Sequence, residues 1–372
     1  MQFQNLVKRF QRYILSIPVS LRRKILIALS LSLVLCFNLY FRSFPFEFPH
    51  LKIRAKKMVM ERIYQGLGYE VYKKFPQLNP LARERLIKQS VSDYSRINKK
   101  EIENEIRQLY LKLKDRYQDD NHQTYMFELD CWHWARYVEN VLKHGYPGDE
   151  LVYGEQRDLY MTAPLGFTML WDRFLFYLSA FFYKIFSFFK PVALFRFLFG
   201  LPLFFITIFI VVLFYFSFSF SRYIGAITSS LFVGLAPIFL PRSCAGWFDK
   251  DILNLLFPLL SCWCYLLGVV NKNFIKKTIW IILSSLWIGL FCFNWTHWWF
   301  IFFIIIIYGF FSFMIYFIRY LYKKDTPLAF INHLFSLALF IILSVCWIVI
   351  FCSPAPLVKL AQQLRLAIIL NI

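Results

Sequence analysis

From residue 191 onward the sequence is an almost uninterrupted series of apolar runs, separated only by short polar turns. A helix needs about 20 apolar residues to cross the hydrocarbon core of a bilayer, and several of these runs approach that length. A soluble core could not hide the aromatic surface, because the chain of 372 residues contains 45 Phe, 22 Tyr and 11 Trp. The sequence therefore predicts an all-α polytopic membrane protein.

Seven spans are predicted, at about 25–42, 196–217, 223–241, 252–270, 278–293, 298–318 and 333–352. The first apolar run leads to Arg42 rather than to a small-residue cleavage site, which indicates an uncleaved span. Another apolar run, 168–189, contains Asp172, Arg173 and Lys184, and this mixture favours a helix lying in the membrane interface.

The distribution of basic residues predicts the orientation. The chain has 42 Lys plus Arg against 22 Asp plus Glu, or +20, which in a membrane protein indicates cytoplasmic loops and anionic headgroups rather than nucleic acid. If the N-terminus is cytoplasmic and 168–189 does not cross, Arg222 and the basic loops 271–277 and 319–324 share the cytoplasmic side. The C-terminus is then outside.

Four parts follow from this topology: a basic cytoplasmic tail 1–24, a first span 25–42, a long outer-face loop 43–193, and a six-span bundle 194–372. The long loop includes a helical insert and the interfacial helix 168–189. Within the insert, Asn79-Pro80 is typical of a helix start. Apolar residues at helical spacing then predict an amphipathic helix, namely Ile102, Ile106, Leu109 and Leu113.

Acidic residues are rare in the apolar zone. From residue 191 on they are Asp249, Asp251 and Asp325, and the first two form a D-x-D in the second outer loop, 242–251. Carboxylates at a membrane boundary are costly without a partner, so a clustered pair points to a function. Two hard oxygen ligands at i and i+2 suit Mg²⁺ or Mn²⁺. Arg242 lies seven residues before Asp249.

A structural explanation competes with the metal hypothesis. An Asp at the start of a helix caps free N–H groups and suits the helix dipole without any further function. The same alternative holds for Asp130 in the first outer loop, where Glu128 and Asp130 precede an aromatic helix expected to end at Gly145. His133 in that helix is interpreted as packed among aromatic residues rather than as a ligand. The eight cysteines lack C-x-x-C spacing and indicate neither zinc nor a disulfide frame.

These two loops together resemble the catalytic subunit family of oligosaccharyltransferases, the enzymes of asparagine-linked glycosylation. The first loop carries Glu128-Leu-Asp130-Cys-Trp-His-Trp-Ala-Arg136, followed by Val138-Glu-Asn-Val-Leu-Lys-His-Gly145. The second carries Pro241-Arg-Ser-Cys-Ala-Gly-Trp-Phe-Asp249-Lys-Asp251. The D-x-D ending is similar to the prokaryotic branch, and Cys131 replaces the usual Pro.

The resemblance implies a GT-C-type membrane domain that transfers an oligosaccharide from a polyprenyl-(pyro)phosphate donor to the side-chain amide of Asn in Asn-x-Ser/Thr. It implies catalytic roles for Asp130, Arg242 and Asp249. It implies Mn²⁺ or Mg²⁺ at Asp130, Asp249 and Asp251. The expected location is a prokaryotic plasma membrane, with the active site on the outer face.

The resemblance covers only the N-terminal half of the family. No W-W-D-Y-G segment, which reads the acceptor's Ser or Thr in the family, occurs in the sequence. A truncated gene, an incomplete chain, or a separate second chain would each explain this. Two other functions stay open: a polyprenyl-phosphate-sugar transferase with a non-protein acceptor, and a transporter or flippase subunit. The sequon Asn294-Trp-Thr296 lies too close to the membrane to be expected as an acceptor.

Overall fold

The computed structural model describes residues 18–322 and 326–370. It divides into two compact units, which are described separately: residues 43–125 form one, and the chain up to Arg42 together with the chain from Met126 forms the other. Most of the predicted basic tail, and Asp325 in the loop between the last two spans, lie outside the described residues.

The unit of residues 43–125 is the predicted helical insert. Its elements are α3 (Phe44–Glu47), α4 (Pro49–Lys74), α5 (Pro80–Ile97) and α6 (Lys99–Asp115). The predicted helix start is confirmed, because the Asn79 side chain accepts a hydrogen bond from the N–H of Ala82 at 2.8 Å. The predicted apolar stripe is confirmed as well: Leu113 on α6 is buried with residues of α4, and Ile106 and Leu109 pack beside it.

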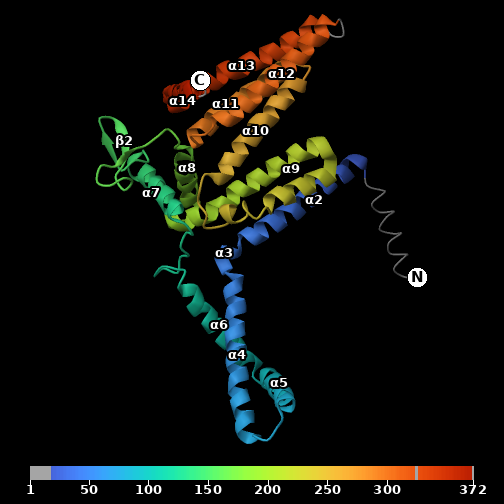
Figure 1. Ribbon diagram of the computed structural model, residues 1–372, viewed down its shortest axis with the longest axis vertical. Helices are drawn as coiled ribbons and strands as arrows, with labels where there is room; N and C mark the ends of the chain where they lie inside the picture. The colour runs from blue at the N-terminus through green and yellow to red at the C-terminus, as the bar shows by residue number, and fades with distance from the viewer. Residues whose placement is uncertain (1–17, 323–325, 371–372) are drawn as a thin grey trace, which may run out of the picture. The chain divides into compact units, whose positions relative to one another are not determined.

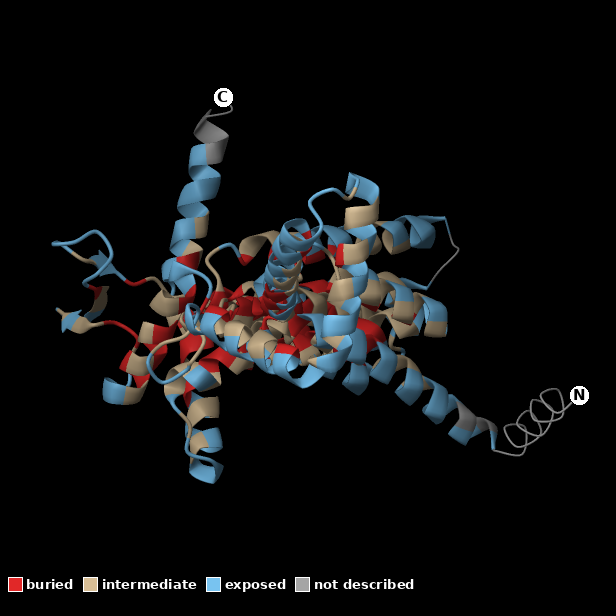
Figure 2. Cartoon of the chain, turned by 90° about the horizontal axis from the view of Figure 1, so that it is seen from below, coloured by how far each residue is buried: buried red, intermediate tan, exposed pale blue. Residues whose placement is uncertain are grey.

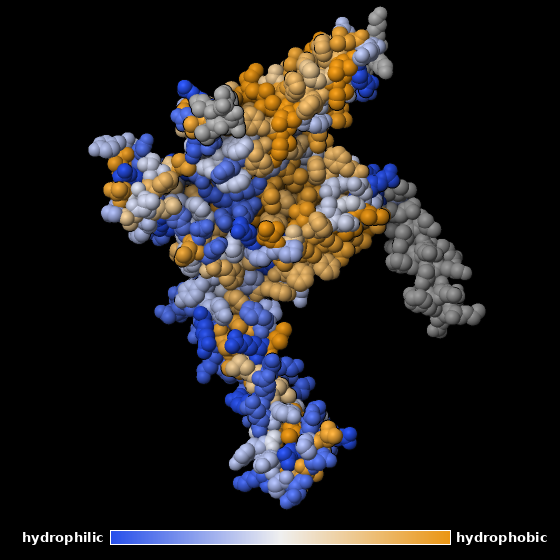
Figure 3. Space-filling view, viewed as in Figure 1, coloured by the Kyte–Doolittle hydropathy of each residue, from blue (hydrophilic) through white to orange (hydrophobic). Residues whose placement is uncertain are grey.

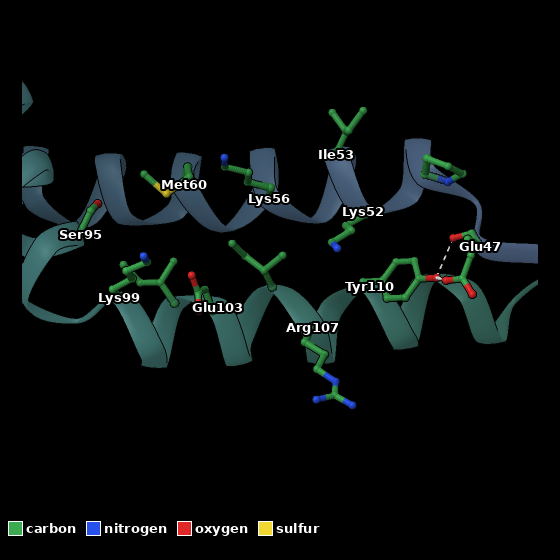
Figure 4. Close-up of a pocket in the computed structure, with 13 residues that line it drawn as sticks. Glu47, Lys52, Ile53, Lys56, Met60, Ser95, Lys99, Glu103, Arg107 and Tyr110 are labelled. Carbon is green, nitrogen blue, oxygen red and sulfur yellow. Dashed lines mark hydrogen bonds between the residues drawn. The ribbon is translucent and has the colours of Figure 1, made fainter. Parts of the chain in front are cut away.

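A groove of about 1130 Å³ lies between α4 and α6 (Figure 4). At one end the Tyr110 hydroxyl donates a hydrogen bond to the Glu47 carbonyl at 2.6 Å. The groove mixes apolar and basic lining residues, among them Lys52, Ile53, Lys56, Met60, Lys99 and Arg107.

The other unit contains the membrane helices. Six described helices are long and apolar enough to cross a bilayer, beginning with α2 (Val19–Arg42). The others are α9 (Leu194–Gly234), α10 (Asp251–Val270), α11 (Phe274–Asn294), α12 (Trp299–Leu321) and α13 (Pro327–Cys352). Hydrophobic side chains cover the outward faces of α9 and of the α10–α13 group (Figure 3). The predicted polytopic helical fold is confirmed.

Helix α9 contains two of the predicted spans. Its backbone leaves the helical region at Arg222, where φ is 52° and ψ is −145°. The chain then folds back, so that Gly234 lies against Ile210 and against Asn38 of α2 (Figure 1). The second arm is shorter than predicted, because the helix ends at Gly234 rather than near residue 241 and continues as turns.

The remaining helices pack as neighbours. Helix α10 lies along α11, α11 along α13, and α13 along α12 (Figure 1). Buried residues are concentrated where these helices meet (Figure 2). At the α10–α11 contact the Ser261 and Ser284 hydroxyls each donate to the other residue's carbonyl, at 2.9 and 2.8 Å. A last helix, α14 (Ala355–Leu370), follows α13.

Between the insert and α9 the chain forms α7 (Leu129–His144), a small sheet and α8 (Phe174–Phe189). The antiparallel sheet β1 (Glu150–Val152), β2 (Glu155–Asp158) and β3 (Phe167–Thr168) was not predicted from the sequence. The predicted interfacial helix 168–189 was wrong at its start, because residue 168 belongs to β3. The helix begins at Phe174. At 16 residues α8 is shorter than the roughly 20 residues of a typical membrane span, and its placement in the membrane interface stays a prediction.

Candidate active site

The D-x-D loop, residues 242–251, connects α9 to α10 and begins in a short 3₁₀ turn, η1 (Pro241–Ser243). Backbone hydrogen bonds hold it against two other segments. The Gly246 N–H donates to the Phe199 carbonyl at 2.8 Å, and the Gly246 carbonyl accepts from the Phe127 N–H at 3.3 Å. Gly246 has φ of +85°, a conformation that favours glycine. The loop conformation therefore depends on the glycine of its motif.

Arg42, the last residue of α2, fixes the start of this loop and is fully buried. Its guanidinium donates to the Ser243 hydroxyl at 2.9 Å, the Gly234 carbonyl at 2.5 Å and the Asn38 side-chain oxygen at 2.9 Å. Its own carbonyl accepts from the Ala245 N–H at 3.0 Å. In the sequence Arg42 marks only the polar end of a span. In the structure its buried side chain joins the end of α2 to α9 and to the D-x-D loop.

Asp249 is in contact with α7. One carboxylate oxygen accepts a hydrogen bond from the Trp134 ring N–H at 2.9 Å and another from the Lys250 N–H at 2.6 Å. Trp134 lies four residues after Asp130 on α7, and residues at i and i+4 share one face of a helix. The face of α7 that carries Asp130 is therefore the face that meets the D-x-D loop.

Asp251 is in contact with Arg242. The guanidinium and carboxylate approach to 3.4 Å, with 56% of the Arg242 side chain and 28% of the Asp251 side chain exposed. Exposed pairs of this kind contribute little to stability, about 0–1 kcal/mol. The geometry leaves both groups accessible to a solute.

Helix capping accounts for only part of this arrangement. The N-cap residue of α10 is Lys250, whose side chain makes no capping bond, and the backbone N–H that Asp249 accepts is that of the next residue rather than one inside the helix. Asp251 lies in the first turn of α10 and Asp130 in the first turn of α7, where a carboxylate suits the helix dipole. The position of Asp249 has no such explanation.

The electrostatics of Asp249 are unusual for an aspartate. Burial raises its pKa to about 6, and the nearby carboxylates of Asp251 and Asp130 add to the rise. Hydrogen bonds from Lys250 and Trp134 oppose it. A raised pKa means that a fixed negative charge here is disfavoured unless a cation or proton compensates it.

Asp130 is close enough to Asp249 to act on it electrostatically, but it is solvent-exposed. Across residues 18–322 and 326–370, no three His, Cys, Asp or Glu side chains lie close enough to hold one metal ion together. The structure thus gives a pair, Asp249 and Asp251, on one loop and a third carboxylate on the facing helix. Arg242 lies beside the pair.

Two charged residues of this region, Lys250 and Asp172, were not predicted from the sequence to belong to the site. Lys250, the middle residue of the D-x-D, is 5% exposed, and its ammonium contacts the Asp172 carboxylate at 2.6 Å. Asp172 precedes α8 and had been interpreted only as a sign of interfacial location. A lysine between two aspartates gives no sequence signal of burial, because its partner lies 78 residues away.

The arginine and asparagine of the first-loop motif connect α7 to the small sheet. Arg136 pairs with Asp149 and, at 2.7 Å, with Asp158. Asp158 is fully buried and also accepts from the Tyr137 hydroxyl. The Asn140 amide donates to the Pro147 carbonyl at 2.9 Å. These residues of the motif are thus structural.

His133 belongs to the same network. Its ring lies between those of Trp134 and Tyr137, with centroids at 4.8 and 4.5 Å, and 3.4 Å from the Asp158 carboxylate. Burial lowers the pKa of His133 and favours the neutral ring. The interpretation of His133 as a packed residue agrees with these contacts.

We expect Asp158→Asn to destabilise this region by about 3 kcal/mol, because it leaves Arg136 and Tyr137 with a weaker buried partner. Thermal unfolding of the detergent-solubilised protein would measure the loss, with exposed Glu155→Gln as control. Burial alone would raise the pKa of Asp158, but bonds from Tyr137, Arg136 and two backbone N–H groups lower it to about 2.

The pH dependence follows from that lowered pKa. The contribution of Asp158 is fully present above its unfolded pKa of about 3.9 and is lost as pH falls towards 2. The wild type should therefore lose stability below about pH 4 more steeply than Asp158→Asn. Parallel acid profiles for the two proteins would contradict this assignment.

Residues 102–370 match the family model described as oligosaccharyl transferase STT3, N-terminal. The chain belongs to the STT3 oligosaccharyl transferase family. The resemblance stated from the two loop motifs is confirmed, as is its restriction to the N-terminal part of the family.

Two relatives carry the name dolichyl-phosphooligosaccharide-protein glycotransferase. The one from Methanococcus voltae is 28% identical over 212 residues, which are 52% of this chain and 22% of the relative. The one from Methanocaldococcus jannaschii is 29% identical over 178 residues, 43% of this chain and 18% of the relative. The match thus spans about a fifth of each relative's length.

A solved structure is also similar, that of the Archaeoglobus fulgidus oligosaccharyltransferase in the apo form. It is 17% identical with a TM-score of 0.49, and the match covers 63% of this chain and 28% of that one.

The asparagine of the sequon in this chain is buried. The Asn294 side chain at the end of α11 is 0% exposed, and its amide donates to the Asn254 side-chain oxygen at 2.9 Å. This burial agrees with the expectation that Asn294 is not an acceptor.

Proposed function

We propose that this chain carries the donor-cleaving part of an oligosaccharyltransferase. The reaction is transfer of an oligosaccharide from a polyprenyl-(pyro)phosphate to the side-chain amide of Asn in an Asn-x-Ser/Thr acceptor. The observation that carries the proposal is the hydrogen bond from Trp134 to Asp249 at 2.9 Å, which joins the two acidic motifs. The relatives' name, a dolichyl-phosphooligosaccharide-protein glycotransferase, supports this choice of donor and acceptor.

The exposed position of Asp130 suits an acceptor group. An amide nitrogen is a poor nucleophile because its lone pair is delocalised, and a carboxylate that accepts the amide N–H bonds weakens this conjugation. Asp130 stands in the first turn of α7 with its side chain open to solvent. We assign it the role of accepting from the acceptor amide as the new C–N bond forms.

Arg242 and the D-x-D loop are assigned to the donor. The Arg242 side chain is 56% exposed and is held near Asp251 at 3.4 Å, so it balances carboxylate charge and can contact a leaving phosphate. Asp249 accepts bonds on one oxygen from Trp134 and Lys250. Its second carboxylate oxygen is the one available to a ligand.

The donor set fits a hard divalent cation. Carboxylate oxygens are the ligands preferred by Mn²⁺ and Mg²⁺. Burial, and then the charges of Asp251 and Asp130, raise the pKa of Asp249, and a bound cation would offset both effects. Asp249 and Asp251 would supply two of its ligands. Asp130, which the resemblance assigns to the same ion, does not lie close enough to both to share one ion in the part of the chain that the structure describes. When bound, the cation would orient the carboxylates and offset charge on the departing phosphate.

The proposal is tested with the purified chain in nanodiscs, a polyprenyl-pyrophosphate oligosaccharide, and an Asn-x-Thr peptide. Release of free oligosaccharide reports donor cleavage with water as acceptor, and a mass increase of the peptide reports transfer. We expect cleavage that requires Mn²⁺ or Mg²⁺ and stops with a chelator. Metal-independent turnover, or a donor left intact, would overturn the proposal. Glycosylation of a non-protein acceptor alone would favour the other transferase class.

The proposal includes the membrane orientation, with the D-x-D loop and α7 on the outer face of a prokaryotic plasma membrane. A membrane-impermeant maleimide added to intact cells should label cysteine introduced at Glu155 and miss cysteine introduced at Lys276. Lys276 lies in the first turn of α11, on the predicted cytoplasmic side. Labelling at Lys276 from outside would contradict the orientation.

A further inference from the structure

Lys250 has an environment that is costly for a lysine. Its side chain is 6% exposed, and its ammonium contacts the Asp172 carboxylate at 2.6 Å and the Asp172 carbonyl at 2.8 Å. It also lies over the rings of Trp134 and Phe176, at 4.4 and 5.0 Å from their centroids. Burying an ammonium is favourable only with a good partner and further contacts, and Lys250 has both.

The partners of Lys250 come from other elements. Trp134 belongs to α7, Phe176 to α8, and Asp172 to the segment that precedes α8. The two aromatic rings stack on each other, with centroids 5.4 Å apart. One side chain from the middle of the D-x-D therefore joins the loop to both helices of the neighbouring segment.

Trp134 connects this cluster to Asp249. The ring that faces the Lys250 ammonium also donates its N–H to the Asp249 carboxylate at 2.9 Å. A shift of Lys250 would move both the loop and the indole that orients Asp249. Side chains that hydrogen-bond to a metal ligand and orient it commonly set metal affinity, and their loss lowers the affinity by about 10–100-fold.

We propose that Lys250 and Asp172, with Trp134 and Phe176, form a positioning clamp that holds the Asp249 carboxylate in its metal-binding geometry. We call these four residues the Lys250 clamp. The inference rests on the proposed function, because the group being positioned is its proposed ligand. Lys250 and Asp172 are positioning residues and touch no reacting atom.

The test uses Lys250→Met, Asp172→Asn, the double variant and Lys250→Arg in the full chain. Met keeps most of the apolar stem and loses the charge, whereas Arg keeps the charge and suits both a carboxylate and aromatic faces. Lys190→Met is the matched control, since Lys190 is an exposed lysine at the end of α8.

Two readouts do not depend on turnover. Mn²⁺ affinity is measured by electron paramagnetic resonance titration. Maleimide labelling of Cys131 is followed by peptide mass spectrometry, since this thiol is 1% exposed and lies against the backbone of Phe248. Cys264, buried within α10, reports global unfolding.

We expect Lys250→Met and Asp172→Asn each to weaken Mn²⁺ binding by about tenfold or more and to raise Cys131 labelling without raising Cys264 labelling. The double variant should bind Mn²⁺ no more weakly, and label Cys131 no faster, than either single variant. The reason is that both substitutions remove the same interaction, the Lys250–Asp172 ion pair. Lys250→Arg should stay within about threefold of wild type. If Lys250→Met does not fold, Asp172→Asn and Lys250→Arg still show whether the Lys250 clamp sets Mn²⁺ affinity and Cys131 labelling.

The clamp is overturned if Lys250→Met and Asp172→Asn leave Mn²⁺ affinity and Cys131 labelling as in Lys190→Met. It is also overturned if the two single effects add fully in the double variant. Asp249→Asn distinguishes a failure of the clamp from a failure of the proposed metal function. If Asp249→Asn binds Mn²⁺ like wild type, the proposed metal function fails, while Cys131 labelling in Lys250→Met still decides whether the clamp holds the loop.

Discussion

Asp249→Asn is expected to lower metal-dependent oligosaccharide release by about 10²–10³-fold while the protein stays folded. Asparagine keeps the shape and can still accept from Trp134, but it removes the charge that a cation requires. The raised pKa of Asp249, about 6, shows how poorly the site compensates that charge by itself.

The measurement is the initial rate of oligosaccharide release at saturating Mn²⁺, with thermal unfolding as the test of folding. Asp93→Asn is the control, because Asp93 is an exposed aspartate in α5 of the other unit. An Asp249→Asn rate near that of wild type would show that this carboxylate is structural.

Gly246→Ala is expected to destabilise the protein by about 2–4 kcal/mol and to reduce activity with it. Two effects add at this position. Its φ of +85° is strained for any side chain, and an added Cβ would lie 2.6 Å from the Phe199 ring and 2.9 Å from the Phe127 ring. Both rings come from segments that hydrogen-bond to this glycine, so neither can move without disturbing the loop.

Gly154→Ala separates the two effects. Gly154, in the turn between β1 and β2, has a similar φ of +84° but no atom within 4 Å of an added Cβ. Its cost should be about 1 kcal/mol, from backbone strain alone. Thermal unfolding of both variants measures the difference, and equal losses would show that close packing at Gly246 contributes nothing.

The helices were largely predictable because their signals are local. Apolar runs of membrane length predicted the spans, and Asn79-Pro80 predicted the start of α5. The stripe from Ile102 to Leu113 predicted the buried face of α6. The exceptions were backbone changes inside apolar runs. The early end of α9 at Gly234 and the strand before α8 leave no mark on the hydropathy profile, whereas the break at Arg222 falls between two predicted spans.

The sequence by itself determined the membrane class, the approximate spans and the family, since composition, run length and two linear motifs are properties of the chain. Only the tertiary structure decided which motif residues are structural. It paired Arg136 with Asp149 and Asp158, buried Arg42, and placed Lys250 against Asp172. The reason is physical: a charged side chain is buried or exposed according to partners far away in sequence, and only folding brings those partners together.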